Sequence, residues 1–493
     1  MNLSRIIEHW AHMRPGHCAI HFQGADLSYA QLWRRVLQLT DVLARQHQVK
    51  RGERIAWLAL NHPDFIALLM ALARLGAIAV PVNFRLAPRE VAAILADADA
   101  RILFADPTML DLARQAARGI DLEVQPVAML DQAVAAGAAI EGRDADPVLL
   151  VYTSGTTGKP KGALHTQDNL LWNYQSAIAA QDITSNDHLL SALPLFHVGG
   201  LNIQFLPTLM AGGTVTLHPR FDPSAWIADV GARRPTLTLL VPATIRAVLD
   251  HPDWPAADLS SLRLINAGSS VVPASMIAAF HARGVPVNQV YGTTETGPVS
   301  ITLRSEDARR KAGSAGKVAL HVEARLVGSD GADVEAGAIG EIWVRGKNVV
   351  TGYWNDPHNP AFADGWFRTG DLARVDEEGF YFVVGRSKDM IISGGENIYP
   401  AELENVLADC PGIAESAVVG QDDARWGEVA VAVVVLRPGV RMSEGDITAL
   451  FEGRLARFKH PRRVLFADQL PKTALGKVQK AELRAAMLAA PRT

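Results

Sequence analysis

The chain has 493 residues, more than one hydrophobic core usually organises, so we expect at least two domains. Its 48% apolar and 20% charged residues are ordinary for a globular protein, and a formal net charge of −4 gives no general attraction to nucleic acid or anionic lipid. The two cysteines, Cys18 and Cys410, lie far apart without CxxC spacing, which argues against a disulfide scaffold or a structural zinc site and favours a reducing compartment.

The sequence also argues against secretion and against membrane insertion. The N-terminal stretch is interrupted by Arg5, Glu8 and His9, so it lacks the apolar core of a signal peptide. The longest apolar stretch, 65–73, is about half as long as a membrane-spanning helix. We therefore expect a cytoplasmic protein with no integral membrane association and no nucleic acid partner.

Short apolar segments alternate with helical segments through the first two thirds of the chain. Residues 54–60 predict a buried strand, residues 63–75 predict a helix that Gly76 ends, and residues 77–82 predict the next strand. The same kind of strand recurs at 148–152, 189–193, 214–217, 236–241, 262–267 and 287–291. This alternation predicts an α/β fold with mostly parallel sheets covered on both faces, and ligands at the carboxyl ends of the strands.

The last third of the chain has a different pattern. From about Gly316, shorter strands separated by Gly and Asp turns predict a small antiparallel, β-barrel-like subdomain. After Arg386 the pattern changes to a small α+β segment, in which Pro400 begins a helix. We predict a large N-terminal domain at 1–386, with two mostly parallel sheets and the barrel-like piece, and a C-terminal α+β domain at 387–493.

The stretch VLLVYTSGTTGKPKG at 148–162 suggests a site for a polyphosphate. A buried strand is followed by a loop whose glycines let backbone N–H groups approach an oxyanion, whose hydroxyls donate hydrogen bonds, and whose lysines supply charge. The spacing is not that of a Walker A loop, and a flexible Gly/Thr turn is the alternative interpretation. The candidate phosphate ligands are Thr153, Ser154, Gly155, Thr156, Thr157, Gly158 and Lys161.

Five motifs together give the chain a family resemblance. TSGTTGKPKG at 153–162 resembles the phosphate loop of the adenylate-forming superfamily, which contains acyl-CoA synthetases, adenylation domains and luciferases. YGTTETG at 291–297, GWFRTGDL at 365–372, GRSKDMIISGGENIYPAE at 385–402 and PKTALGKVQK at 471–480 resemble four further motifs, in the family's order. The resemblance implies an ATP-dependent carboxylate–CoA ligase that forms an acyl-adenylate, uses Mg²⁺, and passes the acyl group to the thiol of coenzyme A.

The resemblance also implies roles around the nucleotide. Tyr291 would stack on adenine, Thr294 would donate to the α-phosphate, and Glu295 would bind Mg²⁺. Asp371 would accept hydrogen bonds from both ribose hydroxyls, and Arg386 would contact ribose or phosphate. Four more residues are implied near adenine and the substrate, namely Gly268, Ser269, Gly292 and Thr293.

The C-terminal motifs imply a mobile domain with two tasks. Lys477 would stabilise the negative charge of adenylation, and its loss would slow that step about 10²–10³-fold, by analogy with other oxyanion donors. Lys388 occupies the hinge position, about which the small domain rotates between the two half-reactions.

After this rotation, a different face of the small domain would line the thiol tunnel. The tunnel residues implied are Ser393, Gly394 and Gly395, because glycines allow a thin chain to approach closely. Trp426 and Phe458 are weaker candidates for the coenzyme A side, and a packed aromatic side chain is the alternative for each.

Substrate choice is expected around three segments, namely PLFHVGG at 194–200, residues 266–270, and Gly292 with Thr293. His197 would close over the carboxylate and gate the acyl pocket, with a core histidine as the alternative, and the place of an amino-acid-binding Asp is taken by this histidine. Gly199, Gly200 and Leu201 would leave an apolar wall that suits an aromatic ring or a medium-length alkyl chain. No arginine in these segments is placed to pair with a second carboxylate, although Arg246 or Arg263 could enter from elsewhere.

Three rivals share these motifs. An adenylating enzyme that loads a carrier protein would use the same residues, because its acceptor is also a phosphopantetheine thiol. A catalytically silent nucleotide- or acyl-binding relative would have no use for Lys477, and luciferase-type oxidation is a rare elaboration. A homodimer is a family-level expectation.

Overall fold

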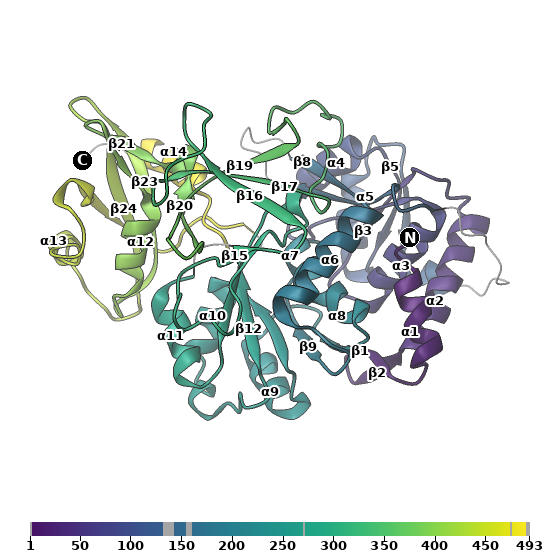
Figure 1. The fold of residues 1–493 in the computed structure, drawn as a ribbon. Coiled ribbons are helices and arrows are strands. Elements are labelled where there is room, and N and C mark those ends of the chain that lie inside the picture. The colour runs from purple at the N-terminus through teal and green to yellow at the C-terminus, as the bar shows by residue number, and fades with distance from the viewer. Residues whose placement is uncertain (1, 132–141, 154–159, 270–271, 474–475, 490–493) are drawn as a thin grey trace.

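The computed structural model describes residues 2–131, 142–153, 160–269, 272–473 and 476–489. Two large sheets and an antiparallel sheet form the body of the protein, and a fourth sheet lies at one end with the C-terminal helices (Figure 1). The predicted α/β fold, with a barrel-like piece followed by a small α+β domain, is confirmed. In the described part of the chain, no helix has the length and apolar character needed to cross a bilayer.

The first large sheet has nine strands in the order β15-β14-β13-β12-β11-β9-β10-β1-β2. Its six central strands are parallel, and β2, β14 and β15 are antiparallel edges. The strands are β1 (Cys18–Phe22), β2 (Ala25–Ser28), β9 (His188–Ser191), β10 (Thr214–Leu217), β11 (Leu237–Leu240), β12 (Leu264–Gly268), β13 (Val287–Tyr291), β14 (Ile301–Thr302) and β15 (Lys317–Val318). Each strand predicted here from an apolar run is present.

The second large sheet has six strands in the order β6-β5-β3-β4-β7-β8. Its strands are β3 (Arg54–Leu58), β4 (Ile78–Pro81), β5 (Ala100–Ala105), β6 (Glu123–Pro126), β7 (Pro147–Thr153) and β8 (Lys161–Thr166). All neighbours are parallel except β7 and β8, which pair antiparallel. The candidate phosphate loop therefore connects two antiparallel strands, whereas a Walker A loop connects a strand to a helix.

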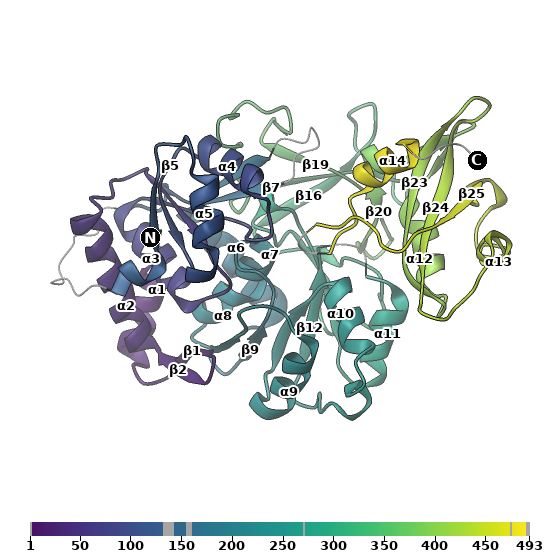
Figure 2. The same cartoon turned by 180° about the vertical axis from the view of Figure 1, so that it is seen from behind.

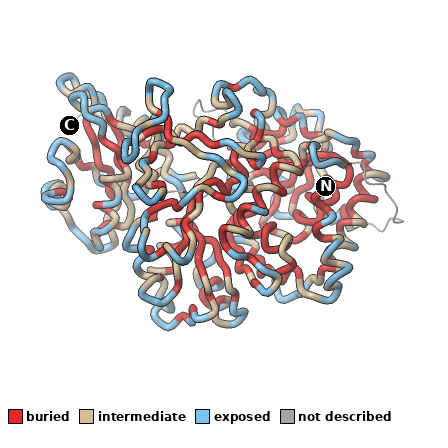
Figure 3. The backbone as a smooth tube through the Cα atoms, in the orientation of Figure 1, coloured by how far each residue is buried: buried red, intermediate tan, exposed pale blue. Residues whose placement is uncertain are grey.

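Helices cover both large sheets, and the most deeply buried of them lie between the sheets (Figures 1 and 3). The N-terminal helices are α1 (Arg5–Met13), α2 (Tyr29–Asp41), α3 (Pro63–Leu75), α4 (Pro88–Asp97), α5 (Leu110–Ala116), α6 (Gln167–Gln181), α7 (Val198–Gly200), α8 (Leu206–Met210), α9 (Pro223–Arg233), α10 (Pro242–Leu249) and α11 (Ala274–Ala282). In α3, Pro63 is the first residue and Gly76 follows the last with φ of +71°, as predicted. One core cluster joins the two sheets through Phe65 of α3 and Tyr174 of α6.

The antiparallel sheet is built from β16 (Val322–Val327), β17 (Gly340–Gly346), β18 (Phe362–Ala363), β19 (Trp366–Val375) and β20 (Tyr381–Arg386). The terminal sheet contains β21 (Ile391–Ser393), β22 (Glu396–Ile398), β23 (Ile413–Asp423), β24 (Gly427–Leu436) and β25 (Arg463–Phe466). Its helices are α12 (Pro400–Ala408), α13 (Glu444–Ala449) and α14 (Lys480–Ala489). Leu403, Val406 and Leu407 of α12 are buried in one cluster, which confirms the helix face predicted from their spacing.

Candidate active site between the two domains

A cleft of about 270 Å³ lies where the carboxyl ends of four parallel strands meet a loop of the C-terminal domain. Phe84, Ala192, Pro219 and Val241, which follow β4, β9, β10 and β11, lie on the N-terminal side. The opposite side is formed by Lys472, Thr473 and Gly476, in the yellow segment that runs back to the middle of the protein before α14 (Figure 2). Ligands of parallel sheets bind at this edge.

Lys477 reaches this region because Gly476 fits closely against α10. A Cβ atom on Gly476 would lie 2.7 Å from Cβ of Ala243, and the φ of Gly476 is +77°, so this position favours glycine. Lys477 keeps contact with solvent, but desolvation by the surrounding protein, followed by the charge of Arg386, lowers its pKa to about 8, while Asp371 opposes this shift. The structure thus brings Lys477 beside two nucleotide-site candidates from the other domain.

Asp371 and Arg386 face each other across β19 and β20, and Tyr291 approaches from the end of β13. Asp371 is 7% exposed; its Oδ1 accepts from Arg386 Nε at 2.8 Å and its Oδ2 accepts from the Tyr291 hydroxyl at 2.9 Å. Asp371 raises the pKa of Arg386, and burial together with Asp371 raises that of Tyr291. Each carboxylate oxygen has a second lone pair, so Asp371 can still accept from two ribose hydroxyls.

Thr294 and Glu295 are buried in the 3₁₀ turn Thr294–Thr296, which follows β13. The Tyr353 hydroxyl donates to Glu295 Oε1 at 2.6 Å, and the backbone N–H of Val350 donates to the Glu295 carbonyl at 2.9 Å. Burial, followed by the charge of Glu295, raises the pKa of Tyr353. Tyr353 was not among the residues predicted from the sequence; it lies between β17 and β18, flanked by Gly352 and Trp354 in a segment without a recognised motif.

The surroundings of Glu295 fit a magnesium ion that arrives with ATP. Among the described residues, no group of three or more His, Cys, Asp or Glu side chains could hold a metal. One oxygen of Glu295 is engaged by Tyr353, and no described residue donates a hydrogen bond to the other. Mg²⁺ keeps several waters and commonly binds one or two carboxylates plus substrate phosphates, so a single available carboxylate oxygen suits it.

Two of the candidate phosphate ligands lie in the described residues. Thr153 and Lys161 pair in the β7–β8 ladder, and the Thr153 hydroxyl donates to the Lys161 carbonyl at 3.4 Å. Lys161 Nζ lies 5.0 Å from the centroid of the Tyr353 ring, so Tyr353 contacts both Lys161 and Glu295. Outside the described residues lie Ser154, Gly155, Thr156, Thr157 and Gly158.

The backbone packs tightly around two of the residues predicted to lie near adenine. A Cβ atom on Gly268 would lie 2.7 Å from the Val290 carbonyl oxygen, and one on Gly292 would lie 1.6 Å from the Pro298 carbonyl oxygen. Both positions therefore exclude any larger residue. Ser269 has φ of +70°, which is strained for serine, and the Thr293 hydroxyl is buried with no partner among the described residues.

His197 is held in a defined neutral form at the N-terminus of α7. The backbone N–H of Gly199 donates to His197 Nδ1 at 3.0 Å, so the ring proton is carried by Nε2. Burial, with a smaller effect of Lys477, lowers the pKa of His197 to about 4. The expected open wall is partly wrong: a Cβ on Gly200 would lie 2.3 Å from the Pro194 carbonyl oxygen, and Leu201 is buried in the core cluster between the sheets.

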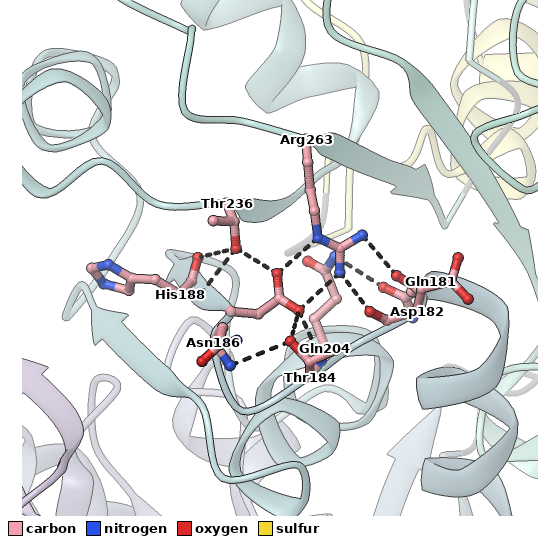
Figure 4. A network of polar contacts seen from close by, with 9 residues as sticks. Gln181, Asp182, Thr184, Asn186, His188, Gln204, Thr236 and Arg263 are labelled. Atoms are coloured by element: carbon pink, nitrogen blue, oxygen red, sulfur yellow. Dashed lines mark hydrogen bonds and ion pairs between the residues drawn. The ribbon is translucent and has the colours of Figure 1, made fainter.

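Arg263 is not available to pair with a second carboxylate of a substrate. Its guanidinium binds both carboxylate oxygens of Asp187, at 2.7 and 3.0 Å, and the backbone carbonyls of Gln181 and Asp182 (Figure 4). Arg246 lies on α10 beside Asp250, and burial lowers its pKa. These two arginines were the remaining candidates for recognition of a dicarboxylic acid. In the structure, the Arg263 guanidinium is used for contacts within the protein.

The candidates for the coenzyme A side are brought together away from this cleft. Gly394 and Gly395 form the turn between β21 and β22 with φ of +61° and +87°. The Gly394 N–H donates to the Trp426 carbonyl at 2.7 Å, and a Cβ on Gly394 would lie 2.7 Å from the Trp426 ring. Phe458 is 43% exposed, and Lys388 is exposed in the 3₁₀ turn Ser387–Asp389.

Two family models match most of the chain. The AMP-binding enzyme family matches residues 7–354, and the C-terminal domain of AMP-binding enzymes matches residues 402–477. The chain therefore belongs to the AMP-binding enzyme family.

Three relatives illustrate this membership over almost the whole length. The chain is 48% identical over 503 residues to indoleacetate–CoA ligase of Aromatoleum aromaticum, which covers 98% of each chain. It is 44% identical over 476 residues to a feruloyl-CoA synthase of Amycolatopsis sp, covering 96% of each. O-Succinylbenzoate coenzyme A synthetase of Bacillus subtilis, solved with ATP and magnesium ion, superposes with a TM-score of 0.89 at 33% identity over 97% of this chain and 98% of that one.

Proposed function

We propose that this protein activates an aromatic carboxylic acid with ATP and transfers the acyl group to coenzyme A. It is an ATP-dependent, AMP-forming acid–thiol ligase, as the family match over both parts of the chain and the related CoA ligases indicate. The observation that carries the mechanism is the approach of Lys477, from one domain, to Asp371 and Arg386 of the other. Relatives named for indoleacetate and ferulate support the aromatic acid over a medium-chain alkyl acid.

In the first half-reaction, a carboxylate oxygen of the acid attacks the α-phosphorus of ATP, and the bond to pyrophosphate breaks. Lys477 and Thr294 stabilise the negative charge that develops on the transferred group, while Asp371 orients the ribose. Mg²⁺ held by Glu295 would neutralise charge on the phosphates. His197 is neutral and presents an Nε2–H donor, which can orient a carboxylate without a proton transfer.

In the second half-reaction, the thiol sulfur of coenzyme A attacks the acyl carbon, the bond to AMP breaks, and the thiol proton passes to solvent. We propose that the domain at 387–493 rotates against 1–386 about Lys388 between these steps. The first family match ends at 354 and the second begins at 402, which supports a boundary in the segment between them. Lys472, Thr473 and Gly476 of the small domain line the cleft, whereas Gly394 is exposed and is not part of that lining, which supports the rotation.

The experiment that tests this function is acid-dependent release of pyrophosphate from MgATP across a panel of carboxylic acids, with and without coenzyme A. Lys477→Ala should slow adenylation about 10²–10³-fold and should still transfer the acyl group from supplied acyl-AMP to coenzyme A. Lys480→Ala is the matched control, because Lys480 lies three residues further along, at the start of α14, and pairs with Glu404 at 2.7 Å.

Three outcomes would contradict parts of the proposal. Binding of ATP without pyrophosphate release for any acid of the panel would favour a binding protein without catalytic activity. Adenylate that forms but reaches only a holo-carrier protein would identify a carrier-loading enzyme. A medium-chain alkyl acid as the best substrate would show that the aromatic assignment is wrong.

Two coarser features complete the proposal. Cys18 and Cys410 are free, which fits a cytoplasmic protein in a reducing compartment. We also propose a homodimer, to be checked by light scattering, where a monomer mass at micromolar concentration would reject it.

A further inference from the structure

A buried network of side-chain amides lies beneath the region where the acid is expected. It joins Gln181 at the end of α6, Gln204 in the π-helical turn Leu201–Phe205, and Asn266 in β12. Gln181 Nε2 donates to the Ile203 carbonyl at 3.0 Å, and Gln181 Oε1 accepts from Gln204 Nε2 at 3.0 Å and from Asn266 Nδ2. Figure 4 shows Gln204 beside Gln181.

The network determines how the Gln204 amide is oriented. A backbone carbonyl can only accept, so Gln181 must turn its NH₂ group toward Ile203 and its oxygen toward Gln204. Gln204 must in turn present its own NH₂ group to that oxygen. The carbonyl oxygen of Gln204 therefore points away from the network, and this assignment follows from the partners alone.

That oxygen has no partner in the part of the chain that the structure describes. Gln204 is 1% exposed, and its Oε1 is fully buried and unpaired. Gln204 also lines a small void of about 10 Å³, together with Ser191 and with the apolar residues Leu189, Ala192, Leu193, Gly200 and Leu239. A space of this size takes one small polar group. An unpaired buried acceptor on a residue that lines such a space is a candidate binding position for a hydrogen-bond donor.

The void lies directly behind the wall of the cleft. Ala192 and Leu193 line both the void and the cleft, and Gly200, which also lines the void, is three residues beyond His197. A ring substituent of an acid bound in the cleft, with its carboxylate at His197, would therefore have the void within reach.

We propose that Gln204 Oε1 accepts a hydrogen bond from a ring N–H or O–H of the acid, so that the enzyme selects aromatic acids that carry such a donor. The inference rests on the proposed function and narrows its substrate class. The acids named for two relatives both carry such a donor, an indole N–H in one and a phenol O–H in the other.

Matched acids that differ only in this donor test the proposal. The pairs are indole-3-acetate with 1-benzofuran-3-acetate and ferulate with 3,4-dimethoxycinnamate, compared by kcat/KM for pyrophosphate release. For the faster pair, the native enzyme should favour the donor-bearing acid by about tenfold or more, because a site that hydrogen-bonds a substrate group rejects the analogue without it. Gln204→Met, which keeps length and removes the acceptor, should bring the ratio to about one.

The matched control is Gln289→Met, the same substitution at another buried glutamine, whose amide donates to the Ser314 carbonyl and which does not line the void, so the ratio should persist. If Gln204→Met does not fold, Gln204→Asn shortens the amide and should also lower the ratio. No preference in the native enzyme for either pair, or a preference that survives in the Gln204 variants, would overturn the inference and assign the void to a structural water. If neither member of any pair releases pyrophosphate while an alkyl acid does, the proposed aromatic function has failed, and this inference fails with it.

Discussion

The lowered pKa of Lys477 gives the adenylation step a pH dependence that an ordinary lysine would not. With a pKa of about 8, roughly 90% of Lys477 is charged at pH 7 and roughly 10% at pH 9, so kcat/KM for ATP should fall about tenfold over this range. A lysine at its usual pKa of about 10.4 would stay charged throughout. The rate falls rather than rises with pH, because the charged form of Lys477 stabilises the transition state and is lost as pH rises.

Bound ATP should shift the fall in rate to a higher pH. The triphosphate places negative charge beside Lys477 and favours its protonated form, so the pKa in the complex is higher than in the free enzyme. The profile of kcat, which reports the complex, should therefore break at a higher pH than the profile of kcat/KM. His197, with its pKa at about 4, should add no break near pH 6.5.

The assay is pyrophosphate release at constant ionic strength from pH 6.5 to 9.5, for the native enzyme and Lys477→Arg. Arginine stays charged over this range, so the variant should show a lower rate and a flat profile. Circular dichroism at each pH checks that the fold is intact. A native kcat/KM that is unchanged between pH 7 and 9, or a break that persists in Lys477→Arg, would refute the assignment of the titrating group to Lys477.

Three further substitutions probe separate contacts. Gly476→Ala should slow adenylation at least tenfold, since the new Cβ would meet Ala243, whereas Gly439→Ala, at a similar φ of +79° with open space around it, should not; initial rates decide this. Tyr353→Phe removes one hydrogen bond to a charged acceptor, worth about 1.5–3 kcal/mol, and should raise the Mg²⁺ concentration needed for half-maximal rate about tenfold or more. Gly394→Ala should slow transfer from acyl-AMP to coenzyme A but leave adenylation unchanged, measured as separate half-reactions, because the added Cβ meets Trp426 away from the cleft.

The elements that the sequence predicted well are those whose signal is local. The helix at 63–75 has proline at its start and a left-handed glycine after its end, and its boundaries match the structure. The strand at 287–291 also matches, because a short apolar run in a parallel sheet is buried on both faces. The composition of residues 153–162 predicts a phosphate-binding role, which stays a prediction. Its setting between two antiparallel strands could not be predicted, since the return strand β8 mixes apolar and polar residues.

The contacts that the sequence could not predict join residues far apart in the chain. Tyr353 and Glu295 are 58 positions apart, and Tyr291 and Asp371 are 80 apart. The motif gave Tyr291 a stacking role, yet its hydroxyl is committed to Asp371, a partner that depends on how β13 and β19 approach each other. Periodicity describes one element at a time, so it carries no information on such pairs.

The lowered pKa of Lys477 depends on how the two domains lie against each other. The surrounding protein that lowers its pKa includes the cleft wall and Arg386, and Lys477 in turn contributes to the lowered pKa of His197. If the C-terminal domain rotates away after adenylation, Lys477 should regain a pKa near that of a free lysine and take up a proton above pH 8. Locking the adenylation conformation should then abolish proton uptake measured with a pH indicator at pH 8.5. Uptake that is unchanged in the locked enzyme would separate the titration of Lys477 from domain movement.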